Sequence, residues 1–205
     1  MGPRRVVVLI SGSGTNLQAL IDAQDTPALP DAQIVLVFSN RKAAYGLKRA
    51  EDAKIPTGYL ALQPYLKTNP GKTRDDYDAE VAKRILAAQP DVVVLAGWMH
   101  VFGDGFLSLV SVPVINLHPA LPGAFDGTNA IERAYDAFQR GEIEHSGAMV
   151  HRVVKDVDRG EPLVVRNVPI EKGESLEDFA TRLHATEWQI IVEATRLVLS
   201  QLQQP

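Results

Sequence analysis

Residues 112–127 read V-P-V-I-N-L-H-P-A-L-P-G-A-F-D-G, and this stretch decides how the rest of the chain is interpreted. Its apolar run stops at Asn116 and His118, which point to the same side of a strand because strand side chains alternate. Pro119 and Pro122 follow and offer no backbone donors to a sheet, which predicts that the strand ends here in a rigid loop. Open α/β sheets bind their ligands at such strand ends, so Asn116 and His118 form the candidate reaction centre.

The N-terminal segment predicts an anion-binding turn. Residues 6–10 are an apolar, mostly β-branched run typical of a buried strand, and S-G-S-G-T-N follows at 11–16 before a helix that begins near Thr15. Backbone N–H groups at a helix N-terminus bind anions. Leu17 replaces the third glycine of the dinucleotide fingerprint, and the Gly-Lys-Ser/Thr ending of nucleotide hydrolases is missing, which favours a phosphate monoester. The alternative is a tight strand-to-helix turn without a ligand.

The order of elements predicts an α/β fold with a Rossmann-like, doubly wound and mostly parallel sheet. Apolar runs indicate strands, and helical spacing indicates the helices between them: strands at 34–38, 59–60 (weak) and 91–96, helices at 44–53, 74–88, 102–109 and 129–140. Residues 146–154 and 162–168 then predict an antiparallel C-terminal strand pair joined by a short connection. A long helix that opens at Ser175 closes the domain.

Composition narrows the class of protein. We expect a single domain over residues 1–205, because no linker divides the 205 residues. The absence of cysteine excludes disulfides, thiolate nucleophiles and Cys-ligated zinc, and too few histidines have ligand spacing to predict a metal site. A net charge of −4 argues against a nucleic-acid partner. No apolar run approaches a membrane span or a signal-peptide core, so we expect a cytoplasmic protein without membrane contact.

Two further segments offer side chains for ligands. Trp98 and Met99 follow the strand at 91–96 and could line a pocket for a flat ring, although large side chains at such positions more often belong to the core. His184 and Glu187 are three residues apart on the last helix and share a face that could reach the glycine turn. The commoner explanation of such a pair is a solvated helix surface.

The chemistry available to Asn116 and His118 suits acyl transfer to an amine. When an amine attacks a carbonyl, the oxygen becomes anionic, and an amide N–H and an imidazolium could each donate to it, a donor being worth roughly 3 kcal/mol. A nearby carboxylate would keep His118 protonated. Spacing leaves both Asp156 and Asp158 open for that role. Competing histidines are His100, His145, His151 and His184.

Five motifs together resemble the phosphoribosylglycinamide formyltransferases, the folate-dependent enzymes of purine synthesis: S-G-S-G-T-N at 11–16, N-R-K at 40–42, L-A-G-W-M at 95–99, N-L-H-P at 116–119 and V-D-R-G at 157–160. The resemblance runs almost from end to end. It implies transfer of a formyl group from 10-formyltetrahydrofolate to the amine of N1-(5-phospho-D-ribosyl)glycinamide in de novo purine (IMP) biosynthesis. It implies no metal, and direct attack through a tetrahedral oxyanion intermediate.

Carried over by position, the resemblance assigns three sets of residues. It implies Asn116, His118 and Asp158, rather than Asp156, as the catalytic group. The other two sets are substrate-phosphate-binding Gly14, Thr15, Asn16 and Glu187, to which the shared helix face adds His184, and folate-binding Arg74, Met99, His100, Val101, Phe102 and Asn116, to which the strand-end position adds Trp98. Residues 1–110 would then form the phosphate-substrate-binding half and residues 111–205 the catalytic and folate-binding half. The chain departs from the family at His100, where many members have Arg, at His184, where Gln or Lys is usual, at Ala148-Met149 and in the loop 122–127.

Two other readings remain open at this stage. The same chemistry could formylate another amine, such as methionyl-tRNA or an amino sugar, although those relatives usually have an extra domain. A nucleotide-binding or regulatory module without catalysis would share the fold. The expected partners are small-molecule substrates, and the chain could be a monomer or a homodimer.

Overall fold

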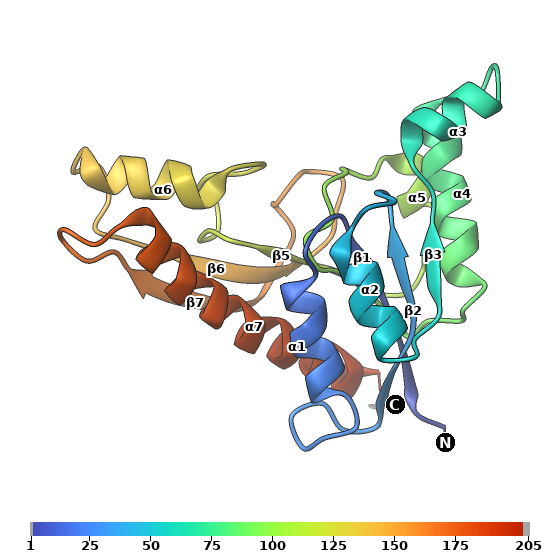
Figure 1. Ribbon diagram of the computed structural model, residues 1–205, viewed down its shortest axis with the longest axis horizontal. Coiled ribbons are helices and arrows are strands. Elements are labelled where there is room, and N and C mark those ends of the chain that lie inside the picture. The colour runs from blue at the N-terminus through green and yellow to red at the C-terminus, as the bar shows by residue number, and fades with distance from the viewer. Residues whose placement is uncertain (1, 203–205) are drawn as a thin grey trace.

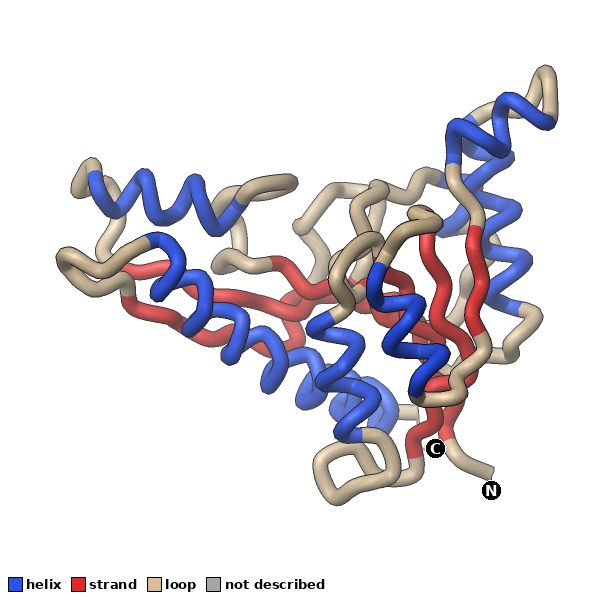
Figure 2. Tube along the Cα trace, in the orientation of Figure 1, coloured by secondary structure: helices blue, strands red, loops and turns tan. Residues whose placement is uncertain are grey.

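The computed structural model describes residues 2–202 and has one seven-stranded sheet, in the order β3-β2-β1-β4-β5-β6-β7. Figure 2 shows the twist of this sheet between its helices. The strands are β1 (Arg4–Ile10), β2 (Ala32–Ser39), β3 (Thr57–Tyr59), β4 (Val92–Leu95), β5 (Val114–His118), β6 (His145–Arg152) and β7 (Pro162–Pro169). The expected α/β class is confirmed, with a mostly parallel sheet and an antiparallel C-terminal end.

The parallel part of the sheet is centred on β1, which pairs with β2 on one side and β4 on the other. Residues Val6 to Ile10 are completely buried, as their unbroken apolar run predicts for a strand covered on both faces. β5 pairs in parallel with β4 and ends at His118, directly before Pro119. The carboxyl ends of β1, β4 and β5 therefore lie at one edge of the sheet.

The antiparallel part begins at β6, which pairs with both β5 and β7. Its register with β5 places His151 opposite Asn116 and Met149 opposite His118. Residues on the same face of neighbouring strands lie close enough for side-chain contact. The register therefore adds a histidine beside the candidate reaction centre.

Helices cover both faces of the sheet (Figure 1). One core cluster packs α1 (Thr15–Ala23), α2 (Tyr45–Asp52) and α7 (Leu176–Gln201) on one face, and a second packs α4 (Arg74–Leu86) and α5 (Asp104–Leu107) on the other. α3 (Leu62–Thr68) contacts α4, and α6 (Ala130–Gln139) contacts α7, where the rings of Tyr135 and Phe179 stack with centroids 6.3 Å apart.

Two helices differ from the expectation. α3 is missing from the sequence-based prediction because it is seven residues long and only Leu62 and Tyr65 pack partly against the core. Pro64 lies in its first turn, where proline is tolerated. α5 is four residues long instead of the predicted span of 102–109. A Cβ at Gly105 would lie 2.2 Å from the carbonyl oxygen of Asp75, so this short helix packs backbone to backbone against α4. Within residues 2–202, no helix has the length and hydropathy of a membrane span.

Candidate active site

Two adjoining cavities open at the carboxyl ends of the parallel strands. The larger, about 570 Å³, includes Asn116, His118 and Asp158 among its lining residues, and the smaller, about 320 Å³, includes the glycine turn. Five residues line both cavities: Arg41, Gly97, Met99, Leu117 and Pro119. Because Leu117 and Pro119 flank His118, the candidate reaction centre lies where the two cavities meet.

Asn116, His118 and Asp158 come together in the structure. His118 Nδ1 lies 3.4 Å from Asp158 Oδ2, and the side chains are only 4% and 8% exposed. Asp156, the other candidate carboxylate, is exposed to solvent. Within the described part of the chain, His118 Nε2 is buried and has no hydrogen-bond partner. The imidazole thus has one nitrogen against a carboxylate and the other free for a ligand.

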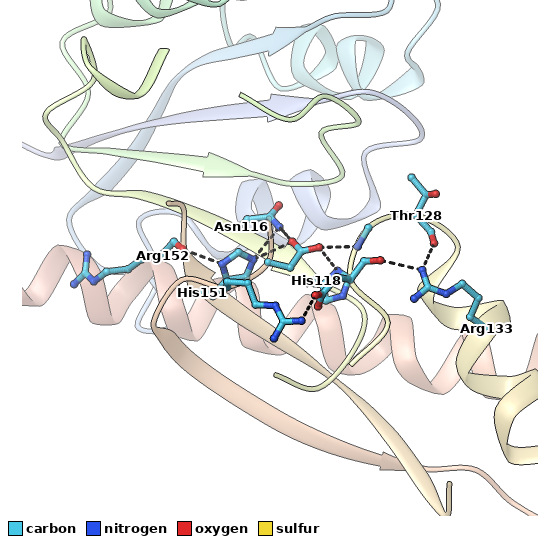
Figure 3. A network of polar contacts seen from close by, with 10 residues as sticks. Asn116, His118, Thr128, Arg133, His151 and Arg152 are labelled. Carbon is cyan, nitrogen blue, oxygen red and sulfur yellow. Dashed lines mark hydrogen bonds and ion pairs between the residues drawn. The ribbon is translucent and has the colours of Figure 1, made fainter. Parts of the chain in front are cut away.

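Asp158 is contacted from several sides, and Figure 3 shows Asn116, His118 and His151 in this polar network. Gly127 N donates to Oδ2 at 2.9 Å, and Asn116 Nδ2 donates to Oδ1 at 3.3 Å. Burial raises the pKa of the Asp158 carboxyl, but the hydrogen bonds from His151 and Gly127 and the charges of His118 and His151 outweigh it, and the pKa lies below its ordinary value. Asp158 is therefore an ionised carboxylate at neutral pH.

His151 is a residue of this cluster that the sequence placed only among the competing histidines. Its Nε2 lies 3.3 Å from Asp158 Oδ1 and 3.1 Å from Asn116 Nδ2, while its Nδ1 lies 2.9 Å from the carbonyl oxygen of Arg152. A carbonyl only accepts, so Nδ1 bears a proton and Nε2 faces the amide and the carboxylate. The register between β5 and β6 brings His151 beside Asn116, and this register cannot be read from the sequence.

Gly160 closes the loop that presents Asp158. A Cβ at this position would lie 1.7 Å from the carbonyl oxygen of Arg152 and 3.3 Å from His151 Nδ1. Only a glycine allows the loop to return this close to β6. The fold therefore requires the glycine of the V-D-R-G motif, because it allows the loop to bring Asp158 next to His151.

The glycine turn has the geometry of an anion site. Gly14 has φ +74° and precedes α1, and a Cβ there would lie 2.6 Å from Gly46 Cα. The outward carbonyls of the turn are occupied, because Gly46 N donates to Gly12 O at 3.1 Å and Arg49 Nε donates to Ser13 O at 2.8 Å. The first N–H groups of α1 have no partner within the helix. They are available to an anion in the smaller cavity.

All five residues expected at the phosphate line this cavity: Gly14, Thr15, Asn16, His184 and Glu187. His184 Nδ1 lies 2.8 Å from Glu187 Oε2, and Asn16 Nδ2 donates to the same oxygen at 3.5 Å. The hydrogen bond to Glu187 raises the pKa of His184. Arg41, which the sequence analysis did not select as a site residue, adds a second cation to the wall.

Of the residues expected at the folate, all but Arg74 line the larger cavity: Trp98, Met99, His100, Val101, Phe102 and Asn116. Trp98 belongs to the core as well, since it is 6% exposed and stacks on Phe102 with centroids 5.4 Å apart. Met99 is 59% exposed and contributes to both cavities. Arg74 does not line the cavity, and its Nη2 donates to the carbonyl oxygen of Val101 at 2.5 Å.

Two buried polar groups hold the loop that follows β4. His100 Nε2 lies 2.6 Å from Asp78 Oδ1, and Asp78 Oδ2 accepts from Gly103 N at 2.8 Å. Ser11 Oγ accepts from Met99 N and donates to Asn40 Oδ1, both at 2.7 Å, so it joins this loop to the ends of β1 and β2. Across residues 2–202, no three His, Cys, Asp or Glu side chains cluster as metal ligands would.

Known proteins resemble the chain over nearly its whole length. A sequence model of the family described as Formyl transferase matches residues 4–195. The phosphoribosylglycinamide formyltransferase of Schizosaccharomyces pombe is 49% identical over 200 residues, covering 95% of this chain and 97% of the relative. That of Saccharomyces cerevisiae is 50% identical over 210 residues, covering 97% and 98%.

A solved structure extends the similarity to three dimensions. Glycinamide ribonucleotide transformylase 1 from Symbiobacterium toebii has a TM-score of 0.86 at 35% identity, covering 97% of this chain and 89% of that protein. The similarity of fold thus extends over nearly the whole chain. The chain therefore belongs to the formyltransferase family and, within it, to the phosphoribosylglycinamide formyltransferases.

Proposed function

We propose that this protein transfers the formyl group of 10-formyltetrahydrofolate to the amine of N1-(5-phospho-D-ribosyl)glycinamide in de novo purine biosynthesis. The observation that carries the proposal is the position of His118 and Asp158 where two cavities of different character meet. One cavity is lined by an anion-binding turn and the other by aromatic and aliphatic side chains. A formyl donor and a phosphorylated acceptor would meet at the imidazole.

The smaller cavity would hold the ribose phosphate. The free N–H groups at the start of α1 would bind the phosphate oxygens, and the helix dipole favours negative charge there. The hydrogen bond to Glu187 raises the pKa of His184, so its imidazole would hold a positive charge to higher pH than an unpaired histidine. The buried carboxylate of Glu187, 4% exposed, would accept from hydroxyl groups of the acceptor. Both side chains come from the second half of the chain, so residues 1–110 would bind the phosphate with help from α7.

The larger cavity would hold the folate. Its volume of about 570 Å³ lies in the range of small-molecule sites, roughly 300–1,000 Å³. Trp98, Phe102 and Val153 provide apolar walls for a flat ring, and Asn116 stands at the polar end. Arg74 holds the Val101 carbonyl at the rim, where its guanidinium is exposed to an anionic tail. These features fit a long amphipathic donor.

The transfer needs donors for an oxyanion and a route for one proton. The acceptor nitrogen bonds to the formyl carbon, the bond from that carbon to the folate nitrogen breaks, and a proton passes from the amine to the leaving nitrogen. Asn116 Nδ2 and His118 Nε2 would donate to the oxygen while it is anionic, each worth roughly 3 kcal/mol. Asn116 Nδ2 now contacts Asp158 and His151 at 3.3 and 3.1 Å, so a small rotation of the amide redirects one N–H. Asp158 stabilises the imidazolium.

A direct assay tests the proposal. The purified protein receives both substrates, and the appearance of deformylated folate is followed by absorbance. We expect turnover, its loss in His118→Ala, and binding of the glycinamide ribonucleotide by that variant within about threefold of wild type. The proposal fails if the wild type produces no deformylated folate. A protein that only binds the phosphorylated ligand would have no turnover for the substitution to remove.

A further inference from the structure

Two arginines hold the loop between β5 and α6 where it touches Asp158, and Figure 3 shows one of them, Arg133, beside Thr128. Arg159 Nη2 forms an ion pair with Asp126 Oδ2 at 2.6 Å. Arg133 Nη1, on α6, donates to the carbonyl oxygens of Asp126 and Thr128 at 2.9 and 3.1 Å. Arg133 thus fixes the backbone of this segment, and Arg159 ties its carboxylate to the loop between β6 and β7.

The same segment supplies a hydrogen bond to the reaction centre. Gly127 follows Asp126 directly, and its N–H donates to Asp158 Oδ2 at 2.9 Å. That oxygen is the one that lies 3.4 Å from His118 Nδ1. The direction of the Gly127 N–H therefore influences how the Asp158 carboxylate is oriented toward the His118 imidazole. A loop that moved by about 1 Å would lose the bond, because hydrogen bonds weaken steeply beyond their normal length.

The backbone of these two loops needs support from side chains. Phe125, Asn129 and Asp158 have φ values of 52°, 55° and 56°, in the left-handed region. Non-glycine residues there cost on the order of 1 kcal/mol each and persist only where surrounding contacts hold them. The guanidinium of Arg133 lies 5.6 Å from the Phe125 ring centroid and covers one of these positions. Arg133 and Arg159 both place a guanidinium against this segment.

We propose that Arg133 and Arg159 are positioning residues that hold Asp126 so that the Gly127 N–H keeps the Asp158 carboxylate oriented toward His118. This inference rests on the proposed function, because its consequence is the rate of formyl transfer. Neither arginine touches the reacting atoms, and both act through the loop.

Charge and burial set the expected size of the effect. The Arg159 and Asp126 side chains are 57% and 30% exposed, so the ion pair is screened by salt and its loss alone should leave the fold intact. The other oxygen of Asp126, Oδ1, is buried and has no hydrogen-bond partner within residues 2–202. Removal of Arg159 therefore leaves a partly buried carboxylate without its cation, which favours movement of the loop into water.

A double-mutant cycle with a matched control tests the proposal. Asp126→Asn and Arg159→Met should each lower kcat about fivefold with the KM for the glycinamide ribonucleotide unchanged, and the double variant should lose no more than the worse single variant. The control is Arg140→Met, which removes the ion pair of a similarly exposed arginine to Glu142 at the far end of α6. It should leave kcat unchanged. Unfolding temperatures show whether any variant fails to fold.

The pH dependence separates positioning from a structural effect. The Gly127 bond lowers the pKa of Asp158, so its loss should raise that pKa and move the acid limb of kcat to higher pH in both single variants. Arg133→Met should do the same with a larger loss of kcat, since two carbonyl contacts disappear. Additive losses in the cycle, or an acid limb that stays in place, would overturn the proposal.

A second readout is independent of turnover. The Gly127 amide signal in an NMR titration should follow the ionisation of Asp158 in the wild type and lose this dependence in Arg159→Met. If the wild type transfers no formyl group, the proposed function fails while the positioning is still judged by this signal. An amide that titrates identically in wild type and variant rejects the positioning, whatever the activity.

Discussion

Replacement of Asp158 by asparagine removes one negative charge from the reaction centre and keeps the shape of the side chain. The carboxylate lies 3.4 Å from His118 Nδ1, and both side chains are over nine-tenths buried. Two unit charges about 4 Å apart interact with about 4 kcal/mol at an effective dielectric constant of about 20. Each 1.4 kcal/mol in the barrier is about tenfold in rate. Because His151 shares the carboxylate, we expect kcat to fall by roughly a hundred- to a thousandfold.

The assay follows deformylated folate at saturating concentrations of both substrates, so that kcat is measured separately from binding. The KM for either substrate should stay within about threefold, because the carboxylate contacts the imidazoles rather than the ligands in the proposed arrangement. Asp156→Asn is the matched control, since it removes the same charge two residues away on an exposed side chain. Equal losses in the two variants, or a loss in Asp158→Asn below about threefold, would refute the reasoning.

Three further changes test other parts of the site. His151→Gln should lower kcat roughly tenfold, because a hydrogen bond to a charged group is lost, and a normal kcat would show that Asp158 needs no second imidazole. The raised pKa of His184 keeps the imidazole charged to higher pH, so the KM for the ribonucleotide should increase as pH rises through that pKa. His184→Gln should have a high KM at every pH. A variant whose KM depends on pH as the wild type's does would contradict this role. Gly160→Ala should lower the unfolding temperature by about 3–10 °C, because the added Cβ would lie 1.7 Å from a carbonyl oxygen. The control is Gly2→Ala, whose Cβ meets nothing within 4 Å and should leave the unfolding temperature unchanged. Calorimetry measures both variants.

Local patterns were sufficient for most of the fold. Continuous apolar runs predicted the buried parallel strands, and β1 and β4 are where the runs at 6–10 and 91–96 place them. The antiparallel pair and the long closing helix were also predicted, because a short connection and helical spacing are local signals. α3 was not, since it is seven residues long and has no fully buried side chain, and only Leu62 and Tyr65 pack partly against the core. Two such positions in so short a segment are too few to show a helical period.

The candidate site was predictable where it depends on one segment. Asn116 and His118 share a side of β5 because strand side chains alternate, and Pro119 ends the strand. The contacts that join segments were not predictable. Ser11 bridges the ends of three strands, and His100, which lines the larger cavity, also contacts the buried carboxylate of Asp78.

By itself, the sequence determined a strand, glycine turn and helix at the N-terminus and an Asn-x-His strand end in an α/β fold, because glycine, proline and apolar periodicity act over a few residues. Only the tertiary structure decided which groups meet. Spacing left Asp156 and Asp158 open, and the return of the loop at Gly160 together with the left-handed backbone at Asp158 turns the second of them toward His118. His151 joins them through the β5–β6 register, where a slip of one residue would place it on the opposite face.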